Sequence, residues 1–303
     1  MDWNTAIKGF QIYLKLERSL SSNSIEAYLD DIQKLSSYSN DNLKISSPLH
    51  LNRDQLQEFI YTIFNNGLSD RTQARILSGV KAFYKYLMIE DVIQTNPTSL
   101  IEGPKLSQKI PDVLSIEEIQ LMIEAIDLSD NFGHRDRAII ETLYACGIRV
   151  SECAELKCSL IFDEQSLIRV IGKGNKERLV PIGDQALQQI NLYRNGYRSQ
   201  LPKVKNHEDF LFLNKFGKKI SRISIFNIVK KYKCAAGIEK EISPHSFRHS
   251  FATHLIEAGV NLKSVQEMLG HESITTTEIY THVNTHFLRD TILKFHPRNQ
   301  RTQ

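Results

Sequence analysis

Apolar side chains recur at helical spacing through the first part of the chain. Trp3, Ile7, Phe10 and Leu14 stand three to four positions apart, as on the buried face of an amphipathic helix. Serines at 19–24 interrupt this run and can cap the next helix. We therefore predict an N-terminal domain over 1–95 with four helices: one beginning near Trp3, one at about 25–35, one through Leu56–Ile63, and one that begins after the capping residue Ser69 and runs to Ile89.

The polar face of the fourth predicted helix is basic. Arg71, Arg75 and Ser78 follow one another at spacings of four and three, and Lys81 and Lys85 flank them. A solvated surface and a nucleic-acid contact explain this face equally well from the residues alone.

A proline-rich segment follows this domain. Pro97, Pro104 and Pro111 lie between positions 96 and 112, together with Gly103, and few apolar residues recur there. Proline at this density ends helices and stiffens a connection. We therefore predict a linker over 96–112 and a second domain over 113–303.

The second domain is predicted to be mostly helical with a small antiparallel sheet. Ser115 and Glu118 have the spacing of a capping box, and the alternating runs 167–171 and 178–182 are typical of a hairpin. The glycines beside Lys173 do not form a P-loop, because no Gly-Lys-Ser/Thr occurs and a strand follows. A third short strand is predicted at 210–213. The predicted helices are 115–126, 135–146, 150–156, 184–197, 221–236, one around His245, 262–269, one around Tyr280, and 285–295.

Composition adds only weak constraints. The chain is 41% hydrophobic and 24% charged, enough to bury ordinary cores, with a net charge of +3 and a pI near 8.5. This balance permits nucleic-acid binding without requiring it. Since we see no apolar stretch of membrane-spanning length and no signal-peptide pattern, we expect a cytoplasmic protein with no membrane partner.

The four cysteines form no C-x-x-C pair. Cys146 and Cys153 lie one heptad apart, which predicts two buried thiols on one helix. A reduced protein is the simplest interpretation.

The segment from His245 to Tyr280 carries the candidate chemistry. His245 and Arg248 are three positions apart, His271 lies in a Leu-Gly-His turn, and Tyr280 follows it. Arginine offers a permanently charged fork of donors to a phosphate, histidine exchanges protons, and a tyrosine hydroxyl can act as a nucleophile. No acidic ligand set for a metal stands among them, so the group suits attack of a hydroxyl on a phosphodiester.

Two upstream basic residues complete a pattern of separated motifs. Arg149 lies in Gly-Ile-Arg-Val-Ser-Glu (147–152), and Lys173 lies in the hairpin. In this order and approximate spacing, the G-x-R-x-S-E segment, hairpin lysine, H-x-x-R pair, L-G-H turn and terminal tyrosine resemble the tyrosine recombinase (phage integrase) family. The Tyr-Thr-His-Val run at 280–283 and the His-Pro-Arg run at 296–298 are similar to its Xer subgroup. The resemblance covers essentially the whole chain.

The resemblance implies a role for each of these residues. Arg149 and Arg248 would hold the non-bridging phosphate oxygens, and His271 would add a donor. Tyr280 would attack the phosphorus while His245 accepts or organises its proton. Lys173 would protonate the leaving 5′ oxygen, and Glu152 would orient the surrounding bases. The product would be a 3′-phosphotyrosyl link formed without ATP, metal or other cofactor.

The resemblance also implies a fold and partners. It predicts an N-terminal four-helix SAM-like core-binding domain and a mostly helical DNA breaking-rejoining domain. The substrate would be a double-stranded recombination site, held by a tetramer of this chain or of this chain and a paralogue, with a DNA translocase as a candidate activator. It further implies DNA contacts by Arg71, Arg75, Lys81, Lys230 and Lys231.

The C-terminal apolar stripe allows two interpretations. Phe287, Leu288, Ile292, Leu293 and Phe295 are too many apolar side chains for a lone terminal helix to expose. The helix could fold back on its own domain. In the family, a C-terminal segment docks into the neighbouring protomer, and on that ground we expect truncation after Asn284 to leave a folded protein that has lost cooperative binding.

The sequence leaves other functional classes open. His245 and His249 have zinc-ligand spacing, but the residues between them lack the glutamate of H-E-x-x-H. A metal-dependent nuclease would need carboxylates that this grouping lacks. A catalytically silent DNA-synapsing protein and the integrase of a mobile element are the remaining alternatives to resolution of chromosome or plasmid dimers.

Overall fold

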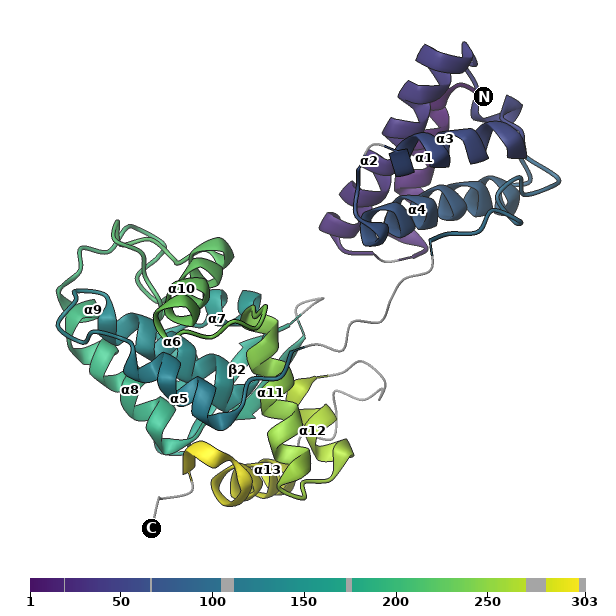
Figure 1. Ribbon diagram of the computed structural model, residues 1–303. Coiled ribbons are helices and arrows are strands. Elements are labelled where there is room, and N and C mark those ends of the chain that lie inside the picture. Colours follow the sequence, from purple (N-terminus) through teal and green to yellow (C-terminus); the bar gives the residue numbers. More distant parts are fainter. Residues whose placement is uncertain (19, 66, 105–111, 173–175, 271–281, 300–303) are drawn as a thin grey trace. The chain divides into compact units, whose positions relative to one another are not determined.

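The chain divides into two compact units, Met1–Lys109 and Ile110–Gln303, here called the N-terminal and C-terminal units (Figure 1). The prediction of a mainly helical protein with one small antiparallel sheet is confirmed. The linker at 96–112 stays a prediction. The computed structural model describes all residues except 19, 66, 105–111, 173–175, 271–281 and 300–303, and it does not describe the side chains of 282–288.

The N-terminal unit is a four-helix bundle, as its hydrophobic pattern predicts. The side chains of Ser21 and Ser69 accept backbone hydrogen bonds at the starts of the second and fourth helices, so both predicted caps are present. Trp3, Phe10 and Phe83 pack ring against ring in its core. The elements are α1 (Trp3–Leu16), α2 (Ser22–Tyr38), the π turn η1 (Ser39–Leu43), the 3-10 turn η2 (Pro48–His50), α3 (Arg53–Asn65) and α4 (Asp70–Ile89).

The C-terminal unit packs its helices around α6, which contacts both α8 and α11. The predicted capping box of Ser115 and Glu118 begins α5. Its helices are α5 (Ile116–Glu124), α6 (Gly133–Cys146), α7 (Val150–Glu155), α8 (Asp184–Asn195), α9 (Tyr197–Gln200), α10 (Arg222–Ala235), α11 (Pro244–Glu257), α12 (Leu262–Leu269) and α13 (His282–Phe295), with 3-10 turns η3 (Cys158–Leu160) and η5 (Pro297–Asn299).

The small sheet has the order β1-β2-β3, with β1 (Ile161–Phe162), β2 (Leu167–Ile171) and β3 (Glu177–Pro181). The hairpin is confirmed, and Val170 pairs with Arg178 in its register. The predicted strand at 210–213 is wrong, because this apolar run forms isolated bridges instead of a ladder. Its residues 211–213 are buried in the core, and backbone Leu211 donates to the Leu156 carbonyl. Burial, and not pairing in a sheet, therefore explains the apolar run.

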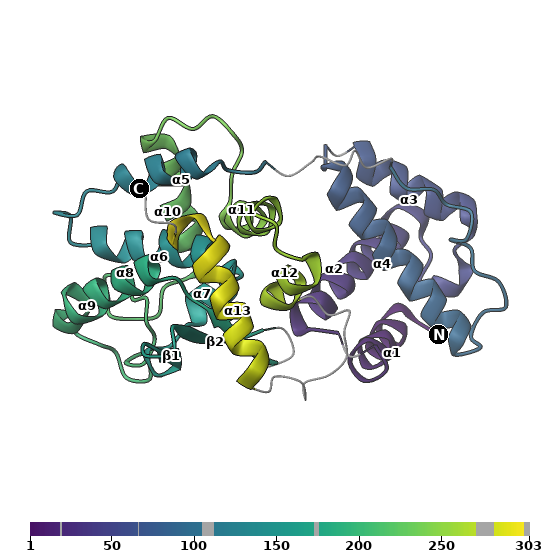
Figure 2. The ribbon, with the colours of Figure 1, turned by 90° about the horizontal axis from the view of Figure 1, so that it is seen from below.

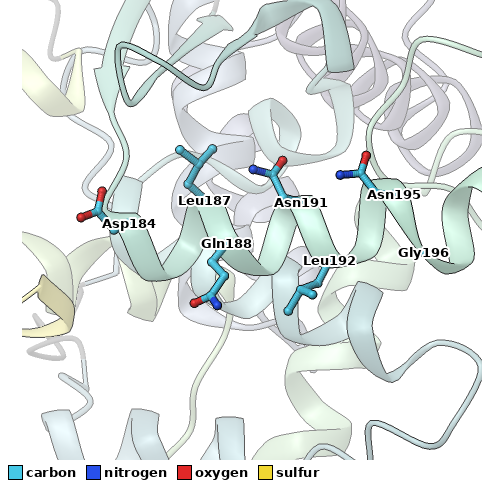
Figure 3. A pocket seen from close by; sticks show the side chains of 7 residues that line it. All are labelled: Asp184, Leu187, Gln188, Asn191, Leu192, Asn195 and Gly196. Carbon is cyan, nitrogen blue, oxygen red and sulfur yellow. The ribbon is translucent and has the colours of Figure 1, made fainter.

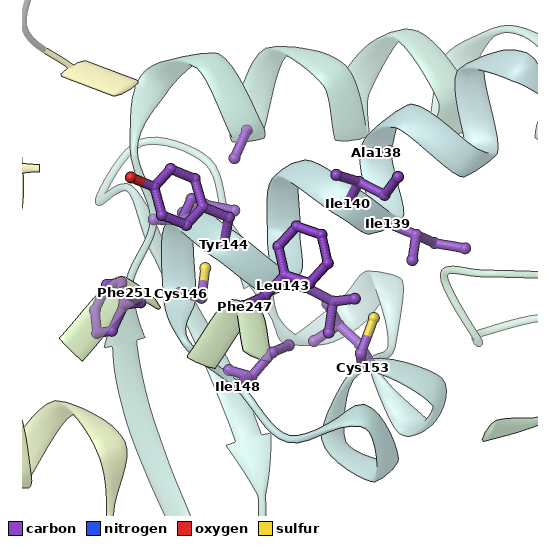
Figure 4. Packing of buried hydrophobic residues seen from close by; sticks show 14 of the residues in the cluster. Ala138, Ile139, Ile140, Leu143, Tyr144, Cys146, Ile148, Cys153, Phe247 and Phe251 are labelled. Carbon is purple, nitrogen blue, oxygen red and sulfur yellow. The ribbon is translucent and has the colours of Figure 1, made fainter. Parts of the chain in front are cut away.

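The core of the C-terminal unit contains both predicted thiols, but not on one helix. Cys146 ends α6 and Cys153 lies in α7, on the far side of the break at Gly147 (Figure 4). Both are fully buried and free, and burial raises the pKa of each thiol. They are therefore inert packing residues.

In the single chain the C-terminal tail folds back on its own unit, which is the first of the two interpretations of its apolar stripe; docking into a neighbouring protomer stays a prediction. Helix α13 lies among the elements of the C-terminal unit (Figure 2). It contacts β3, and Ile292 is buried in the core. After α13, His296 is fully buried against the rings of Tyr144 and Phe251. The side chains of Phe287 and Leu288 lie outside the described residues.

A buried ion pair closes this tail onto α6. Arg298 donates to both carboxylate oxygens of Glu141, whose side chain is 0% exposed, and to Gln120 at 2.6 Å. Removing one partner of such a pair leaves an unpaired buried charge. Truncation after Asn284 would remove Ile292, His296 and Arg298 together, so we now expect it to destabilise the unit.

Arg298→Met is expected to lower the free energy of unfolding of the C-terminal unit by about 3–5 kcal/mol, because Glu141 loses its partner in the core. For a unit of this size, this corresponds to a fall in melting temperature of roughly 10 °C. Thermal denaturation checks it. The double variant Glu141→Met/Arg298→Met should recover part of the loss, and a loss below about 1 kcal/mol in the single variant would show that the tail is not docked in solution.

The buried His296 predicts a loss of stability in acid. Burial lowers its pKa from 6.5 to about 3, and its Nε2 has no hydrogen-bond partner among the described residues. Between these values the unfolded chain binds the proton and the folded chain does not, so stability is full above pH 6.5 and falls as the pH is lowered. The loss reaches about 2 kcal/mol at pH 5, since one pKa unit is worth about 1.4 kcal/mol. Burial also lowers the pKa of His254, which acts in the same direction.

Urea denaturation of the wild type and of His296→Gln at pH 7 and pH 5 measures this effect. The variant should be less stable at pH 7 and should lose about 2 kcal/mol less on acidification. His249→Gln, which removes an exposed histidine of the same unit, should keep the wild-type dependence. Equal acid sensitivity of wild type and His296→Gln would contradict the assignment.

Candidate active site

The end of α6 directs Arg149 to the surface of the C-terminal unit. Gly147 has a φ of +56°, and a Cβ there would lie 2.5 Å from the Phe251 ring, so glycine is required for this turn. Ile148 is then buried, and Arg149 occupies the N-cap position before α7 with its side chain 35% exposed. An arginine fixed by its backbone in this way can reach a bound anion.

Arg248 lies beneath this turn. It projects from α11 between the fully buried Phe247 and Phe251, and its residue is 9% exposed. Its Nη1 donates to the Gly147 carbonyl at 2.7 Å and its Nη2 to the Leu269 carbonyl at 2.6 Å. Burial, and after it the charge of Arg149, lowers the pKa of Arg248 to about 10. Arg248 is therefore still cationic at neutral pH, beside a second cation.

Glu152 lies at the centre of the site. Its oxygens accept from Arg149 Nη1 at 3.0 Å and from the Arg149 backbone N–H at 2.7 Å. Burial alone raises the pKa of Glu152, but the hydrogen bonds and charge of Arg178, followed by those of Arg149, outweigh it and hold this pKa below its ordinary value. Glu152 is thus a carboxylate that orients arginines, and its predicted orienting role now has a geometry.

Arg178 on β3 is the residue that sequence reasoning missed. Its side chain is 8% exposed and donates to Glu152 from Nη1 at 2.7 Å and from Nη2 at 2.9 Å. A charged residue in a strand-like hairpin run is usually interpreted as a surface position. The one sequence signal was its place two positions before Val180, because alternate residues of a strand share a face and Val180 is buried.

Three guanidinium groups converge on the last turn of α12. Arg178 Nε donates to the Met268 carbonyl at 3.3 Å, Arg248 Nη2 to that of Leu269, and Arg149 Nη2 to that of Gly270 at 3.5 Å. These carbonyls lack helical partners and lie at the negative end of the helix dipole. Since Glu152 is the one carboxylate bonded to them in the described structure, the cluster carries excess positive charge suited to a phosphate.

The remaining predicted catalytic residues are described only in part. His245 is exposed in the first turn of α11. Lys173, His271 and Tyr280 lie outside the described residues. The neighbours of two of them belong to the cluster, because a Cβ on Gly172 would lie 3.5 Å from Glu152 Oε1, and the Gly270 carbonyl accepts from Arg149. Lys173 and His271 therefore each follow, in the sequence, a glycine that lies beside the arginine cluster.

The predicted DNA contacts have different surroundings. Arg71 and Lys230 are exposed, and Lys81 is half-buried. Arg75 donates to the buried Asp31 at 2.6 Å, so it also stabilises the packing of α2 on α4, which the sequence did not predict.

Lys231, also exposed, contacts the Tyr232 hydroxyl at 3.2 Å and lies 3.9 Å from Asp130. None of these observations tests a DNA contact, and all five assignments stay predictions.

A separate hollow runs along the outer side of α8 (Figure 3). Its lining comes from that helix and Gly196, and Asp184 is the one ionisable side chain among the residues that line it. This surface offers no nucleophile or cation for phosphate chemistry. Among the described residues, no three His, Cys, Asp or Glu side chains are placed to hold a metal ion, and no helix in that part of the chain has the length and apolar character to cross a membrane.

Comparisons with known proteins identify the family. Residues 112–286 match the phage integrase family, and residues 7–91 match the phage integrase N-terminal SAM-like domain. The chain belongs to the phage integrase family and is a tyrosine-type site-specific recombinase, a DNA strand-transfer enzyme.

Within that family, the chain is similar to tyrosine recombinases named XerD. It is 42% identical over 295 residues to the XerD of Staphylococcus epidermidis, covering 97% of this chain and 99% of that protein. It is 40% identical over 294 residues to the XerD of Staphylococcus haemolyticus, with the same coverage. A solved structure of the XerH recombinase bound to a palindromic difH substrate in a post-cleavage complex is 26% identical, with a TM-score of 0.70, over 91% of this chain and 81% of that one. These similarities support Xer-type recombination.

Proposed function

We propose that this recombinase resolves chromosome or plasmid dimers in the cytoplasm, and that Arg149 and Arg248 hold the phosphate at which it cleaves. The observation that supports the catalytic part is the cluster at the end of α12. Arg149 and Arg248 lie there together with a net positive charge, and Arg149 reaches the surface. Five N–H donors per guanidinium leave several for phosphate oxygens after the structural bonds are made.

The reaction follows from the chemistry of these groups. Tyr280 oxygen bonds to phosphorus as its proton passes to His245, and the bond from phosphorus to the 5′ oxygen breaks as Lys173 supplies a proton to that oxygen. The pentavalent state carries extra negative charge, and each preorganised donor lowers its energy by about 3–4 kcal/mol. His271 adds a donor. The 3′-phosphotyrosyl product keeps the energy of the phosphodiester, so a second strand can displace Tyr280 without ATP.

The proposed partners are those that the family resemblance implies. Two double-stranded sites, each with two half-sites, would be held by four protomers, either copies of this chain or this chain with a paralogue. Arg71, Arg75, Lys81, Lys230 and Lys231 would supply phosphate contacts that make binding salt-dependent. A DNA translocase is the proposed activator. The XerD relatives and the XerH structure with its difH substrate support an Xer site as the substrate.

Sequencing the DNA that is covalently bound to the protein in cells tests this function. Dimer resolution predicts reads that gather at one chromosomal or plasmid site with two half-sites. Reads at the ends of an inserted element would instead identify an integrase of a mobile element. Absence of any covalent DNA, together with specific binding in a gel shift, would identify a catalytically silent synapsing protein.

A further inference from the structure

Arg178 is a buried cation that the proposed chemistry does not use. It lies on β3, its residue is 9% exposed, and all three of its guanidinium nitrogens have acceptors. Burying a guanidinium is costly unless it is fully paired, as this one is. Such a group has no free face for DNA, so its place must be explained through the residues that it contacts.

The first contact concerns charge. Glu152 Oε1 accepts from both Arg149 and Arg178, at 3.0 and 2.7 Å, while Oε2 accepts from Arg178 Nη2. Because Arg178 makes the bidentate pair with Glu152, it balances that negative charge. Arg149 and Arg248 then keep their positive charge for a phosphate. Without Arg178, Glu152 would be left to Arg149 and would neutralise it.

The second contact concerns direction. Arg178 Nε caps the Met268 carbonyl, and its side chain packs against Gly270, which has a φ of +65°. A Cβ on Gly270 would lie 2.9 Å from Arg178 Cδ. The chain turns here immediately before His271, so Arg178 fixes the backbone from which His271 departs.

The third contact concerns the hairpin. Arg178 pairs with Val170 across the sheet, and Gly172, the residue before Lys173, packs beside Glu152 Oε1 and Arg178 Nη1. One side chain thus ties the hairpin, the start of α7 and the end of α12 together. We propose that Arg178 is a positioning residue for strand cleavage, which acts through Glu152 and the last turn of α12 to hold Arg149 free for the phosphate. This inference rests on the proposed roles of Arg149 and Lys173.

Single-turnover cleavage of a nicked suicide DNA at saturating protein tests the proposal, with half-site affinity measured beside it. Arg178→Met should lower the cleavage rate at least about thirtyfold while half-site affinity changes by less than about threefold. Arg178→Lys, which keeps a charge and can bond one oxygen of Glu152, should recover cleavage to within about tenfold of wild type.

Arg198→Met is the matched control for a general loss of stability. Arg198 is equally buried in the same unit and donates to the carbonyls of Glu208, Phe210 and Leu211, none of which belongs to the arginine cluster. Assayed below its melting temperature, this variant should cleave within about threefold of wild type. Cleavage by Arg178→Met equal to that of Arg198→Met at matched fractional folding would overturn the proposal.

A double-mutant cycle with Glu152→Gln separates positioning from an independent effect. Because Arg178 acts in part through Glu152, Arg178→Met should lower cleavage by a factor at least about threefold smaller in the Glu152→Gln background than in the wild type. Multiplicative losses would overturn the proposal. Should Arg178→Met fail to fold, two other comparisons of cleavage rate replace it. The double variant Glu152→Gln/Arg178→Met is compared with Glu152→Gln, and Arg178→Lys is compared with the wild type. Absence of any adduct with the wild type would reject the proposed function instead.

Discussion

Replacing Arg248 with lysine is expected to lower the rate of strand cleavage by about two to three orders of magnitude, at DNA concentrations that saturate the protein. The guanidinium donates at once to the Gly147 and Leu269 carbonyls, and its remaining N–H groups are held beside Arg149. An ammonium is a compact point charge and cannot span two carbonyls and a phosphate in one plane. The variant therefore loses both the donor and the order of the turn that carries Arg149.

Half-site binding should change far less than cleavage, by less than about tenfold, because the proposed DNA contacts lie mostly on other residues. Gel shift and single-turnover cleavage on the same duplex measure the two effects. Arg198→Lys, a buried arginine outside the cluster, controls for destabilisation, and it should keep the wild-type cleavage rate below its melting temperature. Cleavage by Arg248→Lys near the wild-type rate would remove Arg248 from the proposed mechanism.

Local sequence signals predicted most of the fold because their causes are local. The serine caps at Ser21 and Ser69 and the box of Ser115 with Glu118 each satisfy backbone groups within one turn, and all three are present. The apolar run at 210–213 has no such signal, since a short buried segment looks alike whether or not it pairs. The third strand of the sheet is β1 instead, and with two residues it is too short for a hydrophobic pattern to predict.

The separation of Cys146 from Cys153 was within reach of the sequence. The predicted helices 135–146 and 150–156 already placed the two cysteines on different helices, and a heptad spacing has no meaning across a helix end. The packing of the C-terminal tail on its own unit could not be predicted from the sequence. Arg298 and Glu141 are far apart in the sequence, and an apolar stripe does not show which surface it packs against.

The candidate site divides in the same way. The family motifs identified Arg149, Arg248 and Glu152, and the structure brings these three together. Arg178 carried no motif, and its importance arises from a bidentate contact across the unit to Glu152 and a bond to the Met268 carbonyl. Likewise, the spacing of Arg75 on α4 could not show that Asp31 of α2 faces it. Contacts between distant segments therefore had to come from the fold.

Tyr280→Phe is expected to abolish the covalent protein–DNA adduct, because phenylalanine lacks the hydroxyl that we propose as the nucleophile. Binding of a half-site should stay within about tenfold of wild type, or about 1.4 kcal/mol, since only one hydroxyl is lost. Other site variants slow the same step, whereas this one removes a reactant.

The most direct test is to trap the wild-type protein on a nicked suicide duplex, digest the adduct, and identify the modified peptide by mass spectrometry. The account predicts a nucleotide joined through its 3′ phosphate to Tyr280, and no adduct from Tyr280→Phe under the same conditions. A phosphate link on another residue, or an adduct that persists in Tyr280→Phe, would contradict it.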